Sequence, residues 1–434
     1  MERSSFFASL VFCMATCTQC VGVSAVHEQH RASARIEHDI RALASFGTRH
    51  TLSSSADSKR GIAAACAWLH SEFDVISRDF HAGRLVVELH REQLPPSKRV
   101  PEGGALTNVV ALLPGSEPDR IVAVSAHYDS RCSDPLDALS DAPGANDDAS
   151  GTALVLECAR ALAGMQPRAT IAFVCVAGEE QGLLGSKALA ARWAAEGRQV
   201  EAFITCDIIG GARGSNGQRD AQRVRLFSEG VPSSGAKVVG SDNDAPSRQL
   251  ARFIEATAEH ANAAFDVELV FRQDRFLRGG DHKSFNDVGV AAVRFTEPNE
   301  NYAQQHHDVV VEGGVAFGDL PEFVDFDYVA RVTDVCALSL RALALAPAPP
   351  AGVTMDAREL SPDTALSWTP NEHVARYRVR ARRTWQPTWT ETIEVTARDQ
   401  ATLSGWSKDD WCFAVEALDE DGRASLPVVP AARQ

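Results

Sequence analysis

The stretch that decides the fold is TIAFVCVAGEEQG, residues 170–182. Its first part, Thr170 to Val176, is an uninterrupted apolar run of strand length, which predicts a buried β-strand. Two adjacent carboxylates, Glu179 and Glu180, follow that run almost at once. An unpaired carboxylate at the end of a buried strand costs roughly several kcal/mol. The pair therefore indicates a metal ion or a reaction that uses the two acids.

Around this stretch, short apolar runs alternate with helical periodicity from about Arg35 to Ala346. This alternation is typical of an α/β fold in which helices flank a mostly parallel central sheet, and we expect it over residues 26–346. The predicted strands are Val109–Leu113, Ile121–Ala126, Thr170–Val176, Phe203–Cys206 and Val290–Phe295. The predicted helices are Ile62–Phe73, Ala149–Leu162, Arg248–Ala261 and Tyr328–Leu345.

The pattern changes at a proline-rich stretch, and residues 347–352 are predicted to be a semi-rigid linker. Residues 353–429 then alternate polar and apolar side chains with period two and contain no helical pattern. They predict a small all-β sandwich with strands at Ala365–Trp368, Tyr377–Ala381, Thr392–Val395 and Cys412–Ala417. Its early Trp368, its central Tyr-x-Val-x-Ala strand and its late Val-x-Ala-x-Asp-x-x-Gly resemble a fibronectin type III domain.

The N-terminus predicts export. Arg3 precedes an apolar run from Phe6 to Cys17, and Val23-Ser24-Ala25 has the small residues that a signal peptidase recognises, so residues 1–25 are predicted to be a signal peptide. The run is too short to span a membrane. We expect a secreted protein, periplasmic or extracellular, and lipid attachment at Cys17 or Cys20 fits the flanking residues less well.

The length, the net charge and the cysteines of the chain limit the classes of protein and of site that it can represent. At 434 residues the chain is long enough for two or three domains. Its formal charge of -15 at pH 7, without a long basic cluster, argues against nucleic acid as a partner. Cys158, Cys175 and Cys206 lie within apolar patterns, so they are predicted to be buried thiols rather than metal ligands.

Side chains of the kinds that bind metals follow several of the predicted strands. Because the carboxyl ends of parallel strands meet at one edge of a sheet, we expect these side chains to converge. A further acid, Asp147, lies in the polar turn Gly144–Gly151 and can reach the same crevice. The side chains after the strands are His127 and Asp129, the pair Glu179 and Glu180, Asp207, and the pair His306 and His307.

Two imidazoles with three or four carboxylates and no thiolate suit a divalent metal, zinc before manganese or cobalt. Three ionised carboxylates and a hydroxide balance the charge of two divalent cations, which favours a two-metal site. Taken singly, the motifs have ordinary explanations: paired glutamates usually form a solvated helix face, and Asp147-Asp148 could cap a helix. Their joint occurrence after successive strands favours the metal site.

These motifs, in this order along the chain, resemble those of peptidase family M28, the co-catalytic dizinc aminopeptidases. The resemblance spans roughly Asn108 to Asp308, and Arg278–Phe285 is similar to the family's Ser-Asp-His-x-x-Phe segment. It implies two zinc ions per chain, Glu179 as general base, and Asp129 as the residue that orients His127. It further implies His127 and Asp207 on one zinc, Glu180 and His306 on the other, and Asp147 bridging them.

One part of the chain departs from the family's pattern. The stretch Gln304–Asp308 offers both His306 and His307, and we favour His306 because only one of them can face the crevice. His282 is a third candidate, which we expect to line the site or to support a ligand from behind, because the set of ligands is already complete.

The resemblance implies a secreted exopeptidase that acts on peptides or small proteins with a free N-terminus. An acyltransferase of the glutaminyl cyclase type is a competing hypothesis, with a single zinc on a similar fold. A carboxypeptidase or deacylase on the same fold is another. A non-catalytic ectodomain is a third, although such a domain would be expected to lose ligands and here every position is filled.

Overall fold

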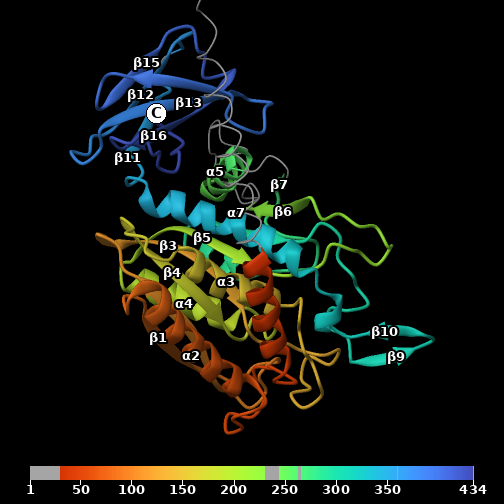
Figure 1. Ribbon diagram of the computed structural model, residues 1–434. Helices are drawn as coiled ribbons and strands as arrows, with labels where there is room; N and C mark the ends of the chain where they lie inside the picture. Colours follow the sequence, from red (N-terminus) through yellow and green to blue (C-terminus); the bar gives the residue numbers. More distant parts are fainter. Residues whose placement is uncertain (1–29, 230–243, 262–264, 359, 434) are drawn as a thin grey trace, which may run out of the picture.

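The computed structural model describes residues 30–229, 244–261, 265–358 and 360–433. The predicted signal peptide, residues 1–25, lies outside this range. Two units are visible in Figure 1, an α/β unit and a smaller all-β unit that follows the long helix α7 (Phe326–Leu345). Within the ranges described, no helix combines the length and the apolar character that a membrane span needs.

An eight-stranded sheet forms the centre of the α/β unit, in the order β1-β2-β4-β3-β5-β8-β6-β7. Its middle strands, β4, β3, β5 and β8, are parallel, whereas β1, β2 and β4 pair antiparallel on one side and β6 pairs antiparallel with β8 on the other. The predicted α/β class is therefore confirmed. The strands are β1 Val86–Leu94, β2 Gly104–Leu113, β3 Glu117–His127, β4 Ala169–Val176, β5 Gln199–Cys206, β6 Arg223–Ser228, β7 Asp266–Val270 and β8 Ala292–Thr296.

Helices cover both faces of this sheet (Figure 1). Along β2, Val109 and Ala111 contribute to one apolar core, while Val110 and Leu112 contribute to the other. Strands that are covered on both faces bury every side chain, which explains the uninterrupted apolar runs in the sequence. One face carries α2 Ile62–His81, α3 Ala149–Ala161, α5 Pro246–Ala261 and α7, and the other carries α4 Leu184–Ala195 and α6 His282–Asn286.

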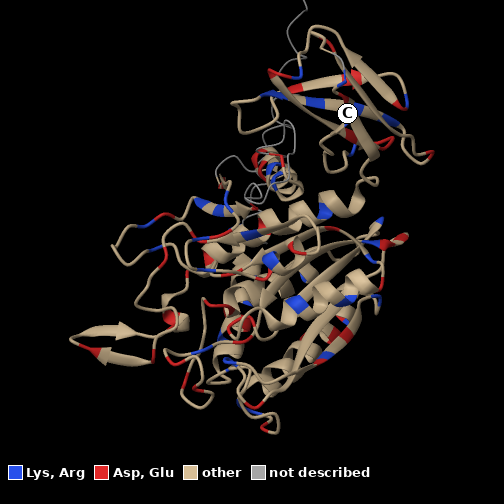
Figure 2. Cartoon of the chain, turned by 180° about the vertical axis from the view of Figure 1, so that it is seen from behind, with Lys and Arg blue, Asp and Glu red and all other residues tan. Residues whose placement is uncertain are grey.

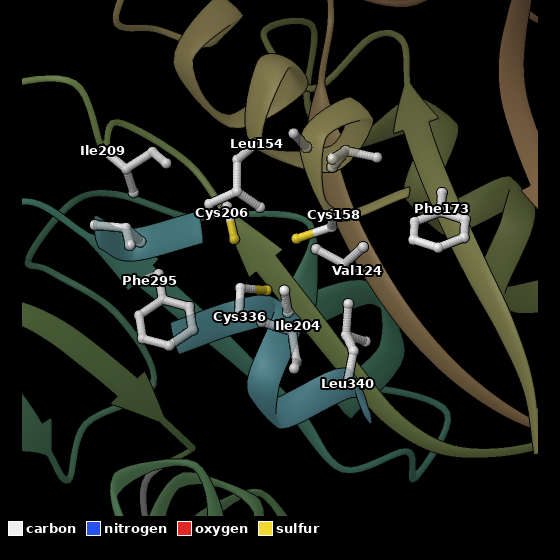
Figure 3. Packing of buried hydrophobic residues seen from close by; sticks show 14 of the residues in the cluster. Val124, Leu154, Cys158, Phe173, Ile204, Cys206, Ile209, Phe295, Cys336 and Leu340 are labelled. Atoms are coloured by element: carbon white, nitrogen blue, oxygen red, sulfur yellow. The ribbon is translucent and has the colours of Figure 1, made fainter. Parts of the chain in front are cut away.

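Three thiols lie together in the first of these cores. Cys158 of α3, Cys206 of β5 and Cys336 of α7 gather between the sheet and the helices (Figure 3). These three and Cys175 are fully buried and form no disulfide. Burial raises the pKa of the Cys158 and Cys206 thiols well above the usual range. The prediction that Cys158, Cys175 and Cys206 are core thiols is confirmed.

The C-terminal unit consists of two antiparallel sheets that enclose a core around Trp368, Tyr377, Val379 and Phe413. One sheet holds β15 Gln400–Leu403, β12 Thr364–Thr369 and β11 Ala351–Asp356, with β17 Ala431–Arg433 added in parallel. The other holds β14 Glu391–Val395, β13 Arg376–Arg383 and β16 Trp411–Leu418. The small all-β unit is present as expected, and its resemblance to fibronectin type III domains stays a prediction.

The two units meet at α5. The buried Asp244 carboxylate accepts hydrogen bonds from Arg252 of α5 (2.9 Å) and from Arg382 of β13 (2.7 Å). Trp389 donates its indole N–H to the side chain of Gln249 at 3.1 Å. Away from this junction, a hairpin of β9 (Val310–Glu312) and β10 (Val315–Phe317) projects from the α/β unit (Figure 2).

The packing of α4 can be tested at Trp193, which is 2% exposed and meets the Phe285 ring edge-on at 5.9 Å. We expect Trp193→Ala to lower the free energy of unfolding by about 3–5 kcal/mol, because it leaves a cavity between α4 and α6. Urea unfolding followed by circular dichroism at the helical band measures this change. Trp385→Ala is the matched control, since Trp385 is 74% exposed; equal stability of the two variants would contradict the packing.

Candidate metal centre

The carboxyl ends of β3, β4 and β5 meet at one edge of the sheet, because these three strands are neighbours and parallel. His127 is the last residue of β3, and Asp207 directly follows β5. Glu179 and Glu180 follow β4 after a short turn, and the loop beyond β8 brings His306 to the same place. The strands thus bring together side chains that are far apart in the sequence.

Asp147 lies between two imidazoles. Its Oδ1 is 3.1 Å from Nε2 of His127, and its Oδ2 is 3.0 Å from Nε2 of His306. Asp207 Oδ1 is 3.8 Å from Nε2 of His127, and Glu180 Oε1 is 2.9 Å from Nε2 of His306. The site therefore consists of two groups, each with one imidazole and one carboxylate of its own, that share Asp147.

The donor atoms of these groups fit divalent cations. Glu180 Oε1 and Asp207 Oδ1 are buried and form no well-aligned hydrogen bond among the described residues, although Nε2 of His306 and Nε2 of His127 lie 2.9 and 3.8 Å away from them. The second oxygen of each carboxylate is occupied: Glu180 Oε2 accepts a hydrogen bond from Arg131 at 2.9 Å, and Asp207 Oδ2 pairs with Arg294 at 2.9 Å. A buried carboxylate oxygen that lacks a good hydrogen bond is costly unless a cation binds it. Nitrogen and oxygen donors without thiolate suit zinc.

Asp148 also lies within ligand distance of His127 and Asp207. Its carboxylate, however, is committed to backbone N–H groups. Oδ2 accepts from His127 at 3.2 Å, while Oδ1 accepts from Gly151 at 3.0 Å and from Ile208 at 3.3 Å. Asp148 thus caps the N-terminus of α3. We therefore assign the shared position to Asp147, whose two oxygens face the two imidazoles.

The electrostatics of the site favour cations. Burial raises the pKa of Asp147, but His306 and His127 outweigh burial and hold this pKa well below its usual range. Burial lowers the pKa of His127, but the carboxylates of Asp129, Asp147 and Asp207 outweigh it and raise this pKa well above the usual range. The carboxylates thus draw a proton onto the imidazole. A divalent cation would replace that proton when it binds.

Asp129 holds two parts of the site. Its carbonyl oxygen is 3.1 Å from Nδ1 of His127, closer than its carboxylate Oδ1 at 3.6 Å. A carbonyl oxygen only accepts, so Nδ1 carries a proton and Nε2 remains as the atom that can bind metal. The carboxylate of Asp129 accepts the backbone N–H groups of Glu179 and Glu180, both at 3.2 Å. Asp129 therefore orients the His127 ring and also the turn that carries the two glutamates.

The two glutamates differ in their surroundings. Glu180 is engaged by Arg131 and His306, whereas the carboxylate of Glu179 has no hydrogen bond within the described ranges and lines the cavity beside the site. Burial raises the pKa of Glu179 well above its usual range, and Asp207 and Glu180 raise it further. A free carboxylate with a raised pKa is suited to proton transfer.

The other two histidines lie elsewhere. His307 is exposed, and its ring lies 5.3 Å from that of Phe317. His282 is fully buried, with Nε2 2.8 Å from the carbonyl oxygen of Gln273, and burial lowers its pKa to about 4. Neither ring belongs to the groups around Asp147.

Sequence reasoning missed three residues that hold the ligands in place. Arg294 pairs with Asp207, and a charged residue inside an apolar strand could have signalled it. Asp319 accepts the backbone N–H of Asp147 at 2.7 Å and lies in a loop without a motif. Arg131 lies 2.6 Å from Nδ1 of His306. Because a guanidinium only donates, Nδ1 of His306 accepts this hydrogen bond, and the ring proton is on Nε2. A cation bound at Nε2 would move that proton to Nδ1, so Arg131 would have to release Nδ1.

Several known proteins are similar to this chain. The model of Peptidase family M28 matches residues 108–310. A probable zinc metalloprotease of Leptosphaeria maculans is 43% identical over 94% of this chain and 96% of its own. The solved LapA aminopeptidase of Legionella pneumophila has a TM-score of 0.52 at 18% identity, covering 74% of this chain and 75% of that one. A glutaminyl cyclase of Bacteroides thetaiotaomicron has a TM-score of 0.50 at 15% identity, covering 71% and 97%.

The shared position of Asp147 has a measurable consequence. We expect Asp147→Ala to remove most bound zinc from both groups, since each loses a carboxylate oxygen. Inductively coupled plasma mass spectrometry of the purified chain measures the zinc content. Asp119→Ala is the matched control, because Asp119 is exposed near the other end of β3. Full zinc content in Asp147→Ala would contradict a shared ligand.

Proposed function

The chain belongs to peptidase family M28, and we propose that it is a secreted zinc metalloprotease that acts as an exopeptidase, releasing N-terminal residues from peptides or small proteins. The observation that carries this proposal is the shared carboxylate of Asp147 next to the free carboxylate of Glu179. Two zinc ions per chain and peptide substrates with a free N-terminus belong to the same proposal. Secretion rests on the signal-type sequence of residues 1–25.

The roles of the residues follow from their positions. His127 and Asp207 would hold one zinc, Glu180 and His306 the other, and Asp147 both. Bound zinc would act as a Lewis acid towards the scissile carbonyl and favour ionisation of the attacking water. Glu179 would accept the proton of that water and deliver it to the leaving amine.

The surroundings of the site support action at a chain end. The site lines a cavity of about 410 Å³, within the size range of small-molecule pockets. Such a cavity suits one end of a peptide. The mono-zinc acyltransferase of the glutaminyl cyclase type remains the competitor on a similar fold, and the shared carboxylate favours two ions over one.

A panel of aminoacyl-anilides, assayed with and without a chelator, tests the reaction class. We expect hydrolysis that the chelator abolishes and that added zinc restores. Peptides with a blocked N-terminus should resist cleavage, whereas peptides with only a blocked C-terminus should be cut. The opposite preference would identify a carboxypeptidase, and cyclisation of N-terminal glutamine with one zinc per chain would identify an acyltransferase.

The role of Glu179 can be separated from that of Glu180. We expect Glu179→Gln to keep its zinc and to lose activity by about 10²-fold or more, because the amide cannot accept the proton. Glu180→Gln should lose zinc as well, since Glu180 Oε1 is one of the two buried oxygens that face an imidazole without a well-aligned hydrogen bond. Turnover and zinc content are measured on the same preparations, and near wild-type turnover in Glu179→Gln would overturn the role.

A further inference from the structure

The cavity beside the metal centre is lined by five arginines, Arg99, Arg131, Arg275, Arg278 and Arg294. Among the described lining residues, only Ile208 and Leu277 are aliphatic. A pocket that selects an apolar side chain is built mainly from apolar walls. This cavity is instead suited to a polar or negatively charged group.

Three of the arginines are already used within the protein. Arg131 binds Glu180, and Arg294 pairs with Asp207 at 2.9 Å. Arg275 donates to Glu300 at 2.6 Å. Because their charges are balanced by these carboxylates, the three serve mainly to hold the site together.

The other two arginines have no such partner. In the part of the chain that the structure describes, the side chains of Arg99 and Arg278 make no ion pair or hydrogen bond. Both side chains line the cavity, so an anion that enters it can pair with guanidinium groups that no described carboxylate already neutralises.

Arg99 and Arg278 reach the cavity from different parts of the fold. Arg99 lies in the loop between β1 and β2, and Arg278 lies in the segment between β7 and α6. Of the acids that line the cavity, Asp147, Glu180 and Asp207 are engaged by imidazoles or by Arg131 and Arg294. Among the described lining residues only the carboxylate of Glu179 has no partner, so the two unpaired arginines outnumber the unpaired acids. Guanidinium groups match the geometry of a carboxylate particularly well.

We propose that Arg99 and Arg278 form a carboxylate-binding subsite of the cavity, so that preferred substrates carry a carboxylate close to the scissile bond. This inference rests on the proposed peptidase function and specifies its substrate class. The carboxylate is either the side chain of an acidic N-terminal residue or the C-terminus of a very short peptide. Both sources present the same pair of oxygens.

Two matched substrate pairs distinguish the sources. Glutamyl-p-nitroanilide is compared with glutaminyl-p-nitroanilide, and the dipeptide Ala-Ala with its C-terminal amide. We expect kcat/KM to be at least about tenfold higher for the carboxylate member of one pair, because a charge-assisted hydrogen bond to an arginine contributes an effect of about this size. The first pair identifies an acidic side chain, and the second identifies a C-terminal carboxylate. Equal kcat/KM within both pairs overturns the proposal.

Variants test the two arginines. Arg99→Gln and Arg278→Gln should each reduce the preference for the carboxylate substrate by about tenfold, while kcat/KM for the neutral partner stays within about twofold. Arg91→Gln is the matched control, since Arg91 is exposed on the same hairpin as Arg99 and does not line the cavity. If both variants keep the wild-type preference for the carboxylate substrate, Arg99 and Arg278 do not form the subsite.

A binding measurement separates this proposal from the peptidase proposal. Isothermal titration of the full chain with glutarate, and with neutral glutaramide, reports the subsite without turnover. We expect Arg99→Gln and Arg278→Gln each to weaken glutarate binding by about tenfold and to leave glutaramide unchanged. If no peptide is hydrolysed but glutarate binding depends on the arginines, the peptidase proposal fails and the subsite stands. If peptides are hydrolysed and glutarate binding ignores both variants, the subsite fails and the peptidase proposal stands.

Discussion

The position of Asp147 between two imidazoles is the constraint on which the rest of the site depends. One carboxylate can face both rings only if the chain before α3 is held firmly. Asp319 holds it by accepting the N–H groups of Asn146 and Asp147, and Asp148 holds it by capping α3. Asp148 also accepts the N–H of Ile208, which fixes the chain just after Asp207. The hydrogen bonds that cap α3 therefore belong to the same network that holds Asp147 and Asp207 in position.

A site so rich in buried acids needs compensating charge, because an unpaired buried carboxylate is expensive. Arg131 and Arg294 supply it by binding the outer oxygens of Glu180 and Asp207, which leaves the inner oxygens free to face a cation. Arg294 is itself held by Asp274 at 3.0 Å. This division also separates the adjacent glutamates: Glu180 is held in place, while the carboxylate of Glu179 has no hydrogen bond within the described ranges, as its proposed role in proton transfer requires.

Much of this could be predicted from the sequence, because apolar runs reveal buried strands and parallel strands place their ends together. The strands β3, β4 and β5 and the acids that follow them were found in this way. The edge strand β1 was missed because its exposed charged residues hide the apolar pattern. Helix α4 was missed as well, because it begins directly after the glutamate turn without a capping side chain. No local pattern ranks Asp147 above Asp148 or His306 above His307, since tertiary hydrogen bonds decide which side chain turns inward.

The fold places the candidate metal ligands on different elements from Arg99 and Arg278, the two lining arginines that have no partner in the described part of the chain. The groups around Asp147 lie at the ends of the parallel strands and in the loop after β8, and the carboxylates of Asp148 and Asp129 hold the backbone at His127, Glu180 and Ile208. Arg99 and Arg278 lie on the β1–β2 connection and on the segment before α6, outside that network. Substitutions in these two segments can change the charge of the cavity without disturbing the shared carboxylate. In this architecture, substrate preference can therefore change while the metal centre stays the same.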